Sequence, residues 1–160
     1  MIEIHVASTD KSDGGSLLLP IQPQLINIPS RVADFARANE FTQKEEFHVT
    51  AIGKRWTPLI PENLQKSVDM LVESVDWKID LNDRYFVLSK HGDNNEEKLS
   101  IVQLVEVPAL NQFIFNLSKL IQQDLGKPYP HITIFTKGSN GGIGIYSEDE
   151  FKNHFVKEIT

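Results

Sequence analysis

The chain of 160 residues carries 16 basic and 22 acidic side chains, giving a formal charge of −6, and contains no cysteine. This length suffices for one domain with a substantial core, and the lack of cysteine excludes disulfides, thiolate metal sites and cysteine nucleophiles. The negative charge argues against a protein that coats long nucleic acid. It still allows a small phosphorylated ligand or an RNA end in a locally positive pocket.

The N-terminal residues have neither the basic region nor the apolar run of a signal peptide. The longest apolar runs, such as residues 17–19, are far too short to cross a bilayer. We therefore expect a cytoplasmic protein with no membrane partner.

Residues 1–30 give mixed signals. Ile2, Ile4 and Val6 alternate with polar neighbours, a pattern that predicts a strand, and the polar, glycine-containing residues 11–16 predict a loop. Residues 17–28 are apolar but contain two prolines, so any strand here is expected to be interrupted or to lie at a sheet edge.

Clearer signals begin at Ser30, which is expected to cap a helix that continues to about residue 39. A strand follows over residues 45–53, and Pro61 is expected to open a second helix whose apolar residues continue to Val75. Residues 84–90 and 98–107 predict two strands joined as a hairpin through residues 92–95.

Pro108 is expected to start a third helix with a long apolar stripe, and Gly126 to stop it. A strand over residues 130–136, a hairpin turn over 138–142 and a short strand over 143–146 are expected next. Ser147 then caps a last helix, and Glu150 completes a capping box. The order of elements predicts an α+β protein, residues 1–160 forming one domain with a rough two-fold repetition.

Two of the five histidines share a local pattern, in which a strand histidine is followed by an apolar residue and then by threonine. The first copy is His48-Val49-Thr50 and the second is His131-Ile132-Thr133. Because side chains alternate along a strand, each histidine and its threonine point to the same face. The other histidines, His5, His91 and His154, lack the pattern and have no partner at metal-ligand spacing, so no metal site is predicted.

Such a pair suits the cleavage of a phosphodiester. One group must deprotonate the attacking oxygen while another protonates the leaving oxygen on the opposite side of phosphorus, and histidine serves either role because its ordinary pKa is near 6.5. Two hydroxyls beside them can donate hydrogen bonds to the non-bridging oxygens, where charge grows. The alternative is that both histidines are structural and that threonine is present for its strand propensity.

Residues 47–53 (FHVTAIG) and 130–136 (PHITIFT) resemble the motifs of the two-histidine (2H) phosphoesterase superfamily, which includes RNA ligase/cyclic phosphodiesterases of the LigT type. The resemblance runs from about residue 30 onward and leaves residues 1–29 unexplained. It implies a bilobal α+β fold, with two antiparallel sheets lining a central cleft and helices outside. Carried over by position, it implies that His48 and His131 are the acid/base pair and that Thr50 and Thr133 hold the phosphate.

Three neighbours of the motifs are candidate substrate-binding residues. Lys54 would make the pocket locally positive, while Trp56 and Tyr129 would stack on a base; the alternatives are a solvated lysine and core aromatics. The glycine-rich residues 138–142 lack the Gly-Lys-Ser/Thr of a phosphate loop, so we interpret them as a turn.

These observations predict a cofactor-independent cyclic phosphodiesterase, a hydrolase, that acts on a 2′,3′-cyclic phosphate or a related 2′-5′ linkage of a nucleotide or RNA end. By resemblance, the product of a cyclic nucleotide is the 2′-phosphate, and a role in RNA processing is implied. RNA-end ligation or repair by the same pair, or a nucleotide- or RNA-binding module with little catalysis, are the alternatives. We expect a monomer that binds no extended duplex. The sequence leaves open which histidine is the base.

Overall fold

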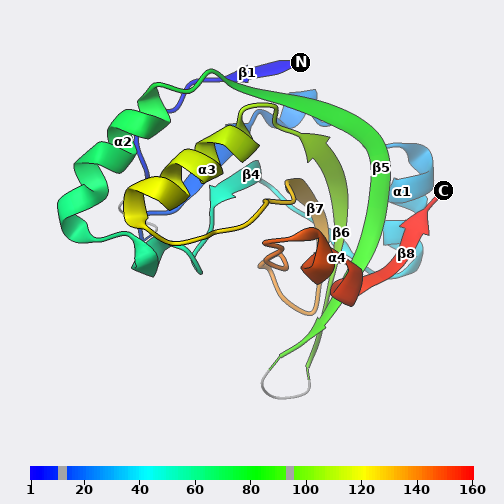
Figure 1. Ribbon diagram of the computed structural model, residues 1–160. Coiled ribbons are helices and arrows are strands. Elements are labelled where there is room, and N and C mark those ends of the chain that lie inside the picture. Colours follow the sequence, from blue (N-terminus) through cyan, green and yellow to red (C-terminus); the bar gives the residue numbers. More distant parts are fainter. Residues whose placement is uncertain (11–13, 93–95) are drawn as a thin grey trace.

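The computed structural model describes residues 1–10, 14–92 and 96–160. The chain has an α+β fold (Figure 1), as the order of predicted elements indicated. Its strands are β1 (Ile2–Ile4), β2 (Leu17–Ile21), β3 (Thr42–Gln43), β4 (Phe47–Ile52), β5 (Trp77–His91), β6 (Glu97–Glu106), β7 (His131–Lys137) and β8 (Phe155–Ile159). Its α-helices are α1 (Ser30–Ala38), α2 (Gln65–Glu73), α3 (Leu110–Ile121) and α4 (Glu148–His154), with short 3-10 turns at Pro23–Leu25, Thr57–Leu59 and Glu62–Leu64.

The described strands form one antiparallel path in the order β1-β5-β6-β7-β4-β2, with β3 paired to β7 and β8 paired to β5. The two ends of the path, β1 and β2, contact each other, so the sheet curls until it is nearly closed. The resemblance to the two-histidine superfamily implies two antiparallel sheets lining a central cleft. The structure has one continuous path instead, because the strands that carry the two histidine motifs pair directly with each other.

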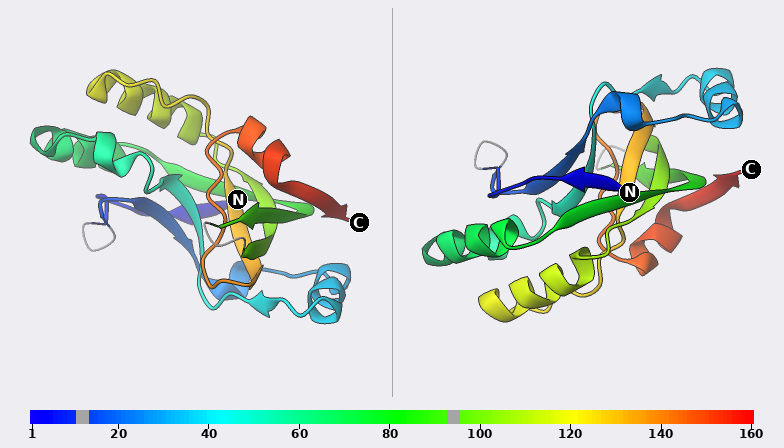
Figure 2. Two further views of the ribbon diagram at one scale, coloured as in Figure 1. Left: turned by 90° about the horizontal axis from the view of Figure 1, so that it is seen from below. Right: turned by 90° about the horizontal axis from the view of Figure 1, so that it is seen from above.

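The main core fills the inside of the curled sheet. Helices α2 and α3 lie side by side against it, which both views of Figure 2 show. The apolar stripe of α3 supplies five fully or almost fully buried side chains to this core: Leu110, Phe113, Ile114, Leu117 and Ile121. A smaller cluster lies on the other face of β5 and β6, where α4 and the segment after β7 cover it.

Several helix boundaries differ from the expected ones. The N-cap of α1 is Pro29, so Ser30 is the first helical residue and its hydroxyl caps nothing. A 3-10 turn, rather than the first turn of an α-helix, follows Pro61. Helix α3 ends at Ile121, and its C-cap Gln122, four residues before Gly126, adopts a left-handed conformation with φ 57°. The backbone of Gln122 therefore adopts the left-handed conformation that glycine usually provides at the end of a helix.

The predicted edge strand in the N-terminal segment is confirmed by β2, which contains Pro20 and, among the described strands, pairs with β4 alone. The predicted hairpin of β5 and β6 is also present, although β5 is longer than expected and begins at Trp77. The turn proposed for residues 92–95 lies largely outside the described residues. Strand β8, which follows α4 directly, was not predicted.

The prediction of a hairpin after β7 is wrong. Residues 138–146 form neither a hairpin nor a strand, but an irregular segment that returns across the face of β7; we call it the strap. It leads into α4, where the Ser147 hydroxyl accepts a hydrogen bond from the Glu150 backbone N–H at 3.2 Å, as the capping box predicted. The Glu150 carboxylate completes the box one residue early, because it accepts from Tyr146 instead of Ser147.

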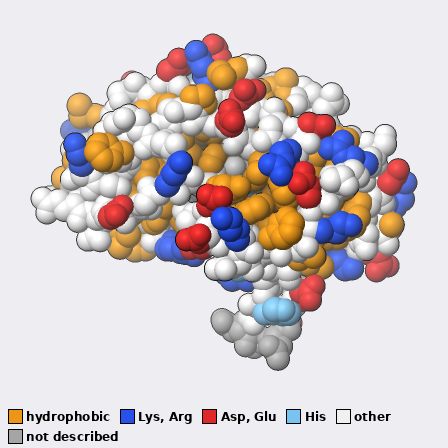
Figure 3. All heavy atoms as spheres, turned by 45° about the vertical axis from the view of Figure 1, so that its right-hand side comes forward, with side chains coloured by type: hydrophobic (Ala, Val, Ile, Leu, Met, Phe, Trp, Pro, Cys, Tyr) orange, Lys and Arg blue, Asp and Glu red, His pale blue; other side chains and the backbone are white. Residues whose placement is uncertain are grey.

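On the face that carries α4 and β8, acidic and basic side chains are interspersed around a central group of hydrophobic ones (Figure 3). Phe155 and Val156 are about half exposed on this part of the molecule. Among the described residues, no helix combines the length and the apolar character needed to cross a bilayer.

Candidate active site

The two histidine motifs lie on adjacent antiparallel strands. Strand β4 pairs with β7 in a register that sets Val49 opposite Ile132. One step to either side of this pair, an antiparallel ladder sets His48 level with Thr133 and Thr50 level with His131. Each histidine therefore lies across from the other motif's threonine, and the four side chains form a square.

The alternation of the two strands fixes the face on which this square lies. Val49 and Ile132 are fully buried in the main core. Their neighbours in sequence must then point to the opposite face of the sheet. A slip of one residue in either strand would bury a histidine and expose a core side chain, so the hydrophobic pattern holds the site in register.

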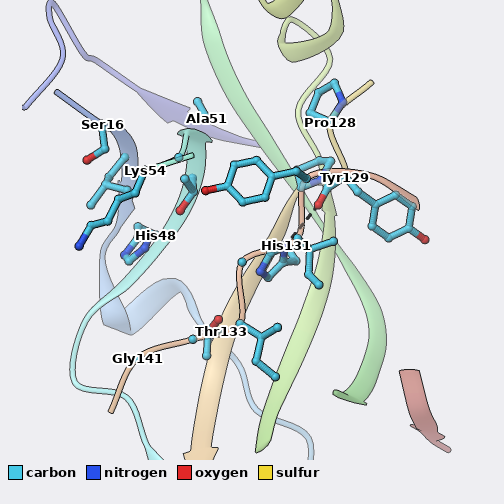
Figure 4. Close-up of a pocket in the computed structure, with 18 of the residues that line it drawn as sticks. Ser16, His48, Ala51, Lys54, Pro128, Tyr129, His131, Thr133 and Gly141 are labelled. Carbon is cyan, nitrogen blue, oxygen red and sulfur yellow. Dashed lines mark hydrogen bonds between the residues drawn. The ribbon is translucent and has the colours of Figure 1, made fainter. Parts of the chain in front are cut away.

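The square lines a cavity of about 500 Å³, a volume typical of a small-molecule site. Figure 4 shows His48 and His131 reaching into this cavity from neighbouring strands, with Thr133 below them. The structure brings all seven residues expected from the sequence to its wall: His48, Thr50, Lys54, Trp56, Tyr129, His131 and Thr133.

The environment of His131 favours a neutral imidazole. Burial lowers the pKa of His131 below its usual value, and the nearby charge of His48 lowers it further. The backbone groups of Tyr129 and Ile143 oppose this shift in part. The Nδ1 atom lies 3.3 Å from the Tyr129 carbonyl oxygen, so in the tautomer with a proton on Nδ1 that N–H donates to the carbonyl and Nε2 keeps its lone pair.

This environment predicts a pH dependence of stability. Below about pH 6.5 the unfolded chain takes up a proton at this histidine, whereas the folded chain does so only at lower pH. Above pH 6.5 His131 is neutral in both states and does not reduce the free energy of unfolding. This free energy should decrease as the pH is lowered toward the folded pKa of His131. Urea unfolding between pH 7 and pH 5 should show a smaller slope for His131→Asn than for wild type. The exposed His5→Asn variant should keep the wild-type slope; an unchanged slope in His131→Asn would contradict the prediction.

The strap covers part of the cavity, and the sequence did not indicate this role. Six of its residues, 141–146, line the cavity. A Cβ atom at Gly142 would lie 2.6 Å from the Thr133 hydroxyl oxygen, which is too close for any side chain. Glycine at this position therefore lets the strap backbone pass directly over the phosphate-binding edge predicted for β7.

Tyr146 fastens the end of the strap to the segment after β4. Its hydroxyl oxygen accepts a hydrogen bond from the Arg55 backbone N–H at 3.1 Å, and the Arg55 guanidinium lies over its ring at 4.0 Å. A Cβ atom at Gly53 would overlap the tyrosine ring. Arg55 also forms an ion pair with Glu150. Glycine is therefore required at position 53, where the first motif ends, because any side chain would overlap Tyr146.

The two aromatic residues expected to stack on a base have other contacts. Trp56 is almost fully buried and packs edge-on against Tyr146, with ring centroids 5.2 Å apart. The Tyr129 ring packs against Phe151 at 4.9 Å, while its backbone carbonyl orients His131. Burial raises the pKa of the Tyr129 hydroxyl, so this group stays protonated at neutral pH.

Basic side chains on the cavity wall outnumber acidic ones. Lys54, expected from the sequence, is joined by Lys44 and Lys98, which the motifs did not indicate. Lys98 lies far from both motifs in the chain, whereas Lys44 lies only four residues before His48. Glu46 is the only carboxylate residue among the lining residues that the structure describes. The cavity is thus locally positive in a chain whose overall charge is negative.

Within the described ranges, no group of three or more His, Asp or Glu side chains is arranged to hold a metal ion. Comparisons with protein-family models, curated proteins and solved structures find no match for this chain. The relation to the two-histidine superfamily therefore rests on the two motifs and stays a prediction.

Proposed function

We propose that this protein is a phosphodiesterase that hydrolyses a 2′,3′-cyclic phosphate, or a related 2′-5′ linkage, of a nucleotide or RNA end. The observation that supports this most strongly is the β4–β7 register, which sets two imidazoles and two hydroxyls around one cavity. In this proposal the fold is a variant of the 2H phosphoesterase architecture, and the β4–β7 ladder is the boundary between its two lobes.

In the proposed reaction, a water molecule attacks phosphorus and one imidazole accepts its proton. The bond from phosphorus to the leaving ribose oxygen breaks, and the second imidazole protonates that oxygen. For a cyclic nucleotide the 3′ oxygen leaves and a 2′-phosphate remains. The hydroxyls of Thr50 and Thr133 donate hydrogen bonds to the non-bridging oxygens as their charge grows.

The environment of His131 favours it as the base. A general base must be unprotonated before the reaction, and burial keeps the pKa of His131 low. His48 then acts as the acid in the hydrolytic direction. Ligation of an RNA end would use the same pair, with the 5′ hydroxyl of a second RNA end attacking phosphorus in place of water, the 3′ oxygen leaving and a 2′-5′ linkage forming.

The test is hydrolysis of adenosine 2′,3′-cyclic phosphate by the purified protein with excess chelator, with the products separated by chromatography. We expect the 2′-phosphate to form at a rate that chelator leaves unchanged. Loss of activity with chelator would contradict the mechanism. Nucleotide binding without turnover would favour a binding module, and joining of RNA ends without hydrolysis would favour a ligase.

A further inference from the structure

Three lysines gather at one end of the cavity. Lys44 and Lys98 line it, and Lys90 of β5 pairs directly opposite Lys98 of β6. Like charges directly opposite each other in an antiparallel pair are destabilising. Among the residues that the structure describes, no carboxylate forms an ion pair with any of the three.

The position of Lys98 relates this cluster to the histidine square. Alternate residues of β6 share a face, and on this face Leu104 pairs with His131 and Val102 with Thr133. Lys98 lies four residues further along the same strand. It therefore faces the cavity from the same side of the sheet, beyond Thr133.

The strap shows how close the Lys98 ammonium lies to the Thr133 hydroxyl. A Cβ atom at Gly141 would lie 3.5 Å from the Lys98 Nζ, and one at Gly142 would lie 2.6 Å from the Thr133 hydroxyl oxygen. Because consecutive Cα atoms are about 3.8 Å apart, the ammonium and the hydroxyl lie beside neighbouring residues of one segment. One ligand of nucleotide size can reach both.

Lys44 is held in place by the backbone. Its Nζ donates a hydrogen bond to the Asn140 carbonyl oxygen of the strap at 2.7 Å, and its own N–H donates to the Ile134 carbonyl at 2.8 Å. Lys137 offers a contrast, because its Nζ donates to the Asn39 carbonyl and it does not line the cavity. The cluster is thus positioned by the fold.

The pKa of Lys98 is lowered by burial and by the charges of Lys90 and Lys44. This arrangement alone does not stabilise the protein, because burial and the two neighbouring charges all disfavour the charged form of Lys98. A bound anion would offset the repulsion between the lysines and would form charge-assisted hydrogen bonds with their ammonium groups.

We infer that Lys44, Lys90 and Lys98 form a second anion subsite, which selects nucleotides carrying a phosphate group in addition to the one at the histidines. This inference rests on the proposed function for the identity of the first site. Two sources share this chemistry: a terminal phosphomonoester of one nucleotide, or the internucleotide phosphodiester of an RNA end.

The experiment measures binding, so that it does not depend on turnover. Calorimetry would compare adenosine 2′-phosphate with adenosine 2′,5′-bisphosphate, and with a dinucleotide that ends in a 2′-phosphate. For the wild type we expect the bisphosphate or the dinucleotide to bind at least about tenfold more tightly than the monophosphate, because charge-assisted hydrogen bonds to the lysines are among the stronger ones. Whichever is preferred identifies the source.

Lys98→Gln and Lys44→Gln should each remove most of this preference, whereas Lys137→Gln, with the same change in charge, should retain it. Thermal unfolding would show that Lys98→Gln is folded, as expected for a change that relieves repulsion. Equal binding of the ligands by the wild type, or a preference that survives both lysine variants, would overturn the subsite. A preference without hydrolysis of any cyclic nucleotide would overturn the proposed function and leave the subsite standing.

Discussion

Replacing His48 or His131 with alanine is expected to lower kcat/KM for a 2′,3′-cyclic nucleotide by about 10²–10⁴-fold, the usual contribution of one general acid or base. One imidazole accepts the proton of the attacking water and the other protonates the leaving oxygen, and both line the same cavity. Steady-state kinetics with the purified variants, alongside far-UV circular dichroism to verify folding, would measure the loss.

The double variant should lose much less than the product of the two single losses, because groups that act as one unit are not additive. The exposed His5→Ala variant is the matched control and should keep full activity. Wild-type activity in either single variant would show that the reaction, if present, does not use this pair.

Replacing Gly142 with alanine is expected to lower turnover by about 10²-fold, although the site itself keeps every predicted catalytic group. The new Cβ would lie 2.6 Å from the Thr133 hydroxyl oxygen, so either the strap or this hydroxyl must move. Threonine has few χ1 rotamers available, and rotation would carry the hydroxyl away from its place. A misplacement of about 1 Å can cost this much in rate.

Gly141→Ala is the matched control for this change. Its Cβ would lie 3.5 Å from the Lys98 Nζ, an ordinary contact, and the conformation of Gly141 is not left-handed. It should retain most activity. Equal activity of the two alanine variants would show that the strap does not position Thr133.

The two strands of the site could be predicted because the pattern that identifies each of them lies within a few consecutive residues. Alternation around Val49 and around Ile132 sets the face of each motif, and the structure has β4 and β7 where the pattern indicated. The pairing that joins them is not local: where two antiparallel sheets lining a cleft were expected, the described strands form one path because β4 pairs with β7. Alternation fixes which face a residue takes, but not which strand lies beside it.

The remaining parts of the site depend on contacts between distant segments. For the strap, the sequence predicts a turn over residues 138–142 and a short strand over 143–146, because glycine serves turns and close approaches alike and the sequence does not show which neighbour is close. The contacts of Tyr146 with Gly53 and Arg55, and the pairing of Lys90 with Lys98, arise only in the folded chain. The contacts of Trp56 with Tyr146 and of Tyr129 with Phe151 likewise arise only between distant segments.

The ladder between β4 and β7 joins segments whose histidines are 83 positions apart in the chain. Pairings of this kind form late, because the entropy of closing a long loop opposes them until other contacts are made. No fragment that contains one motif can assemble the square. During refolding, phosphate affinity should therefore be recovered only together with the complete sheet, which makes ligand binding a direct reporter of the long-range step in folding.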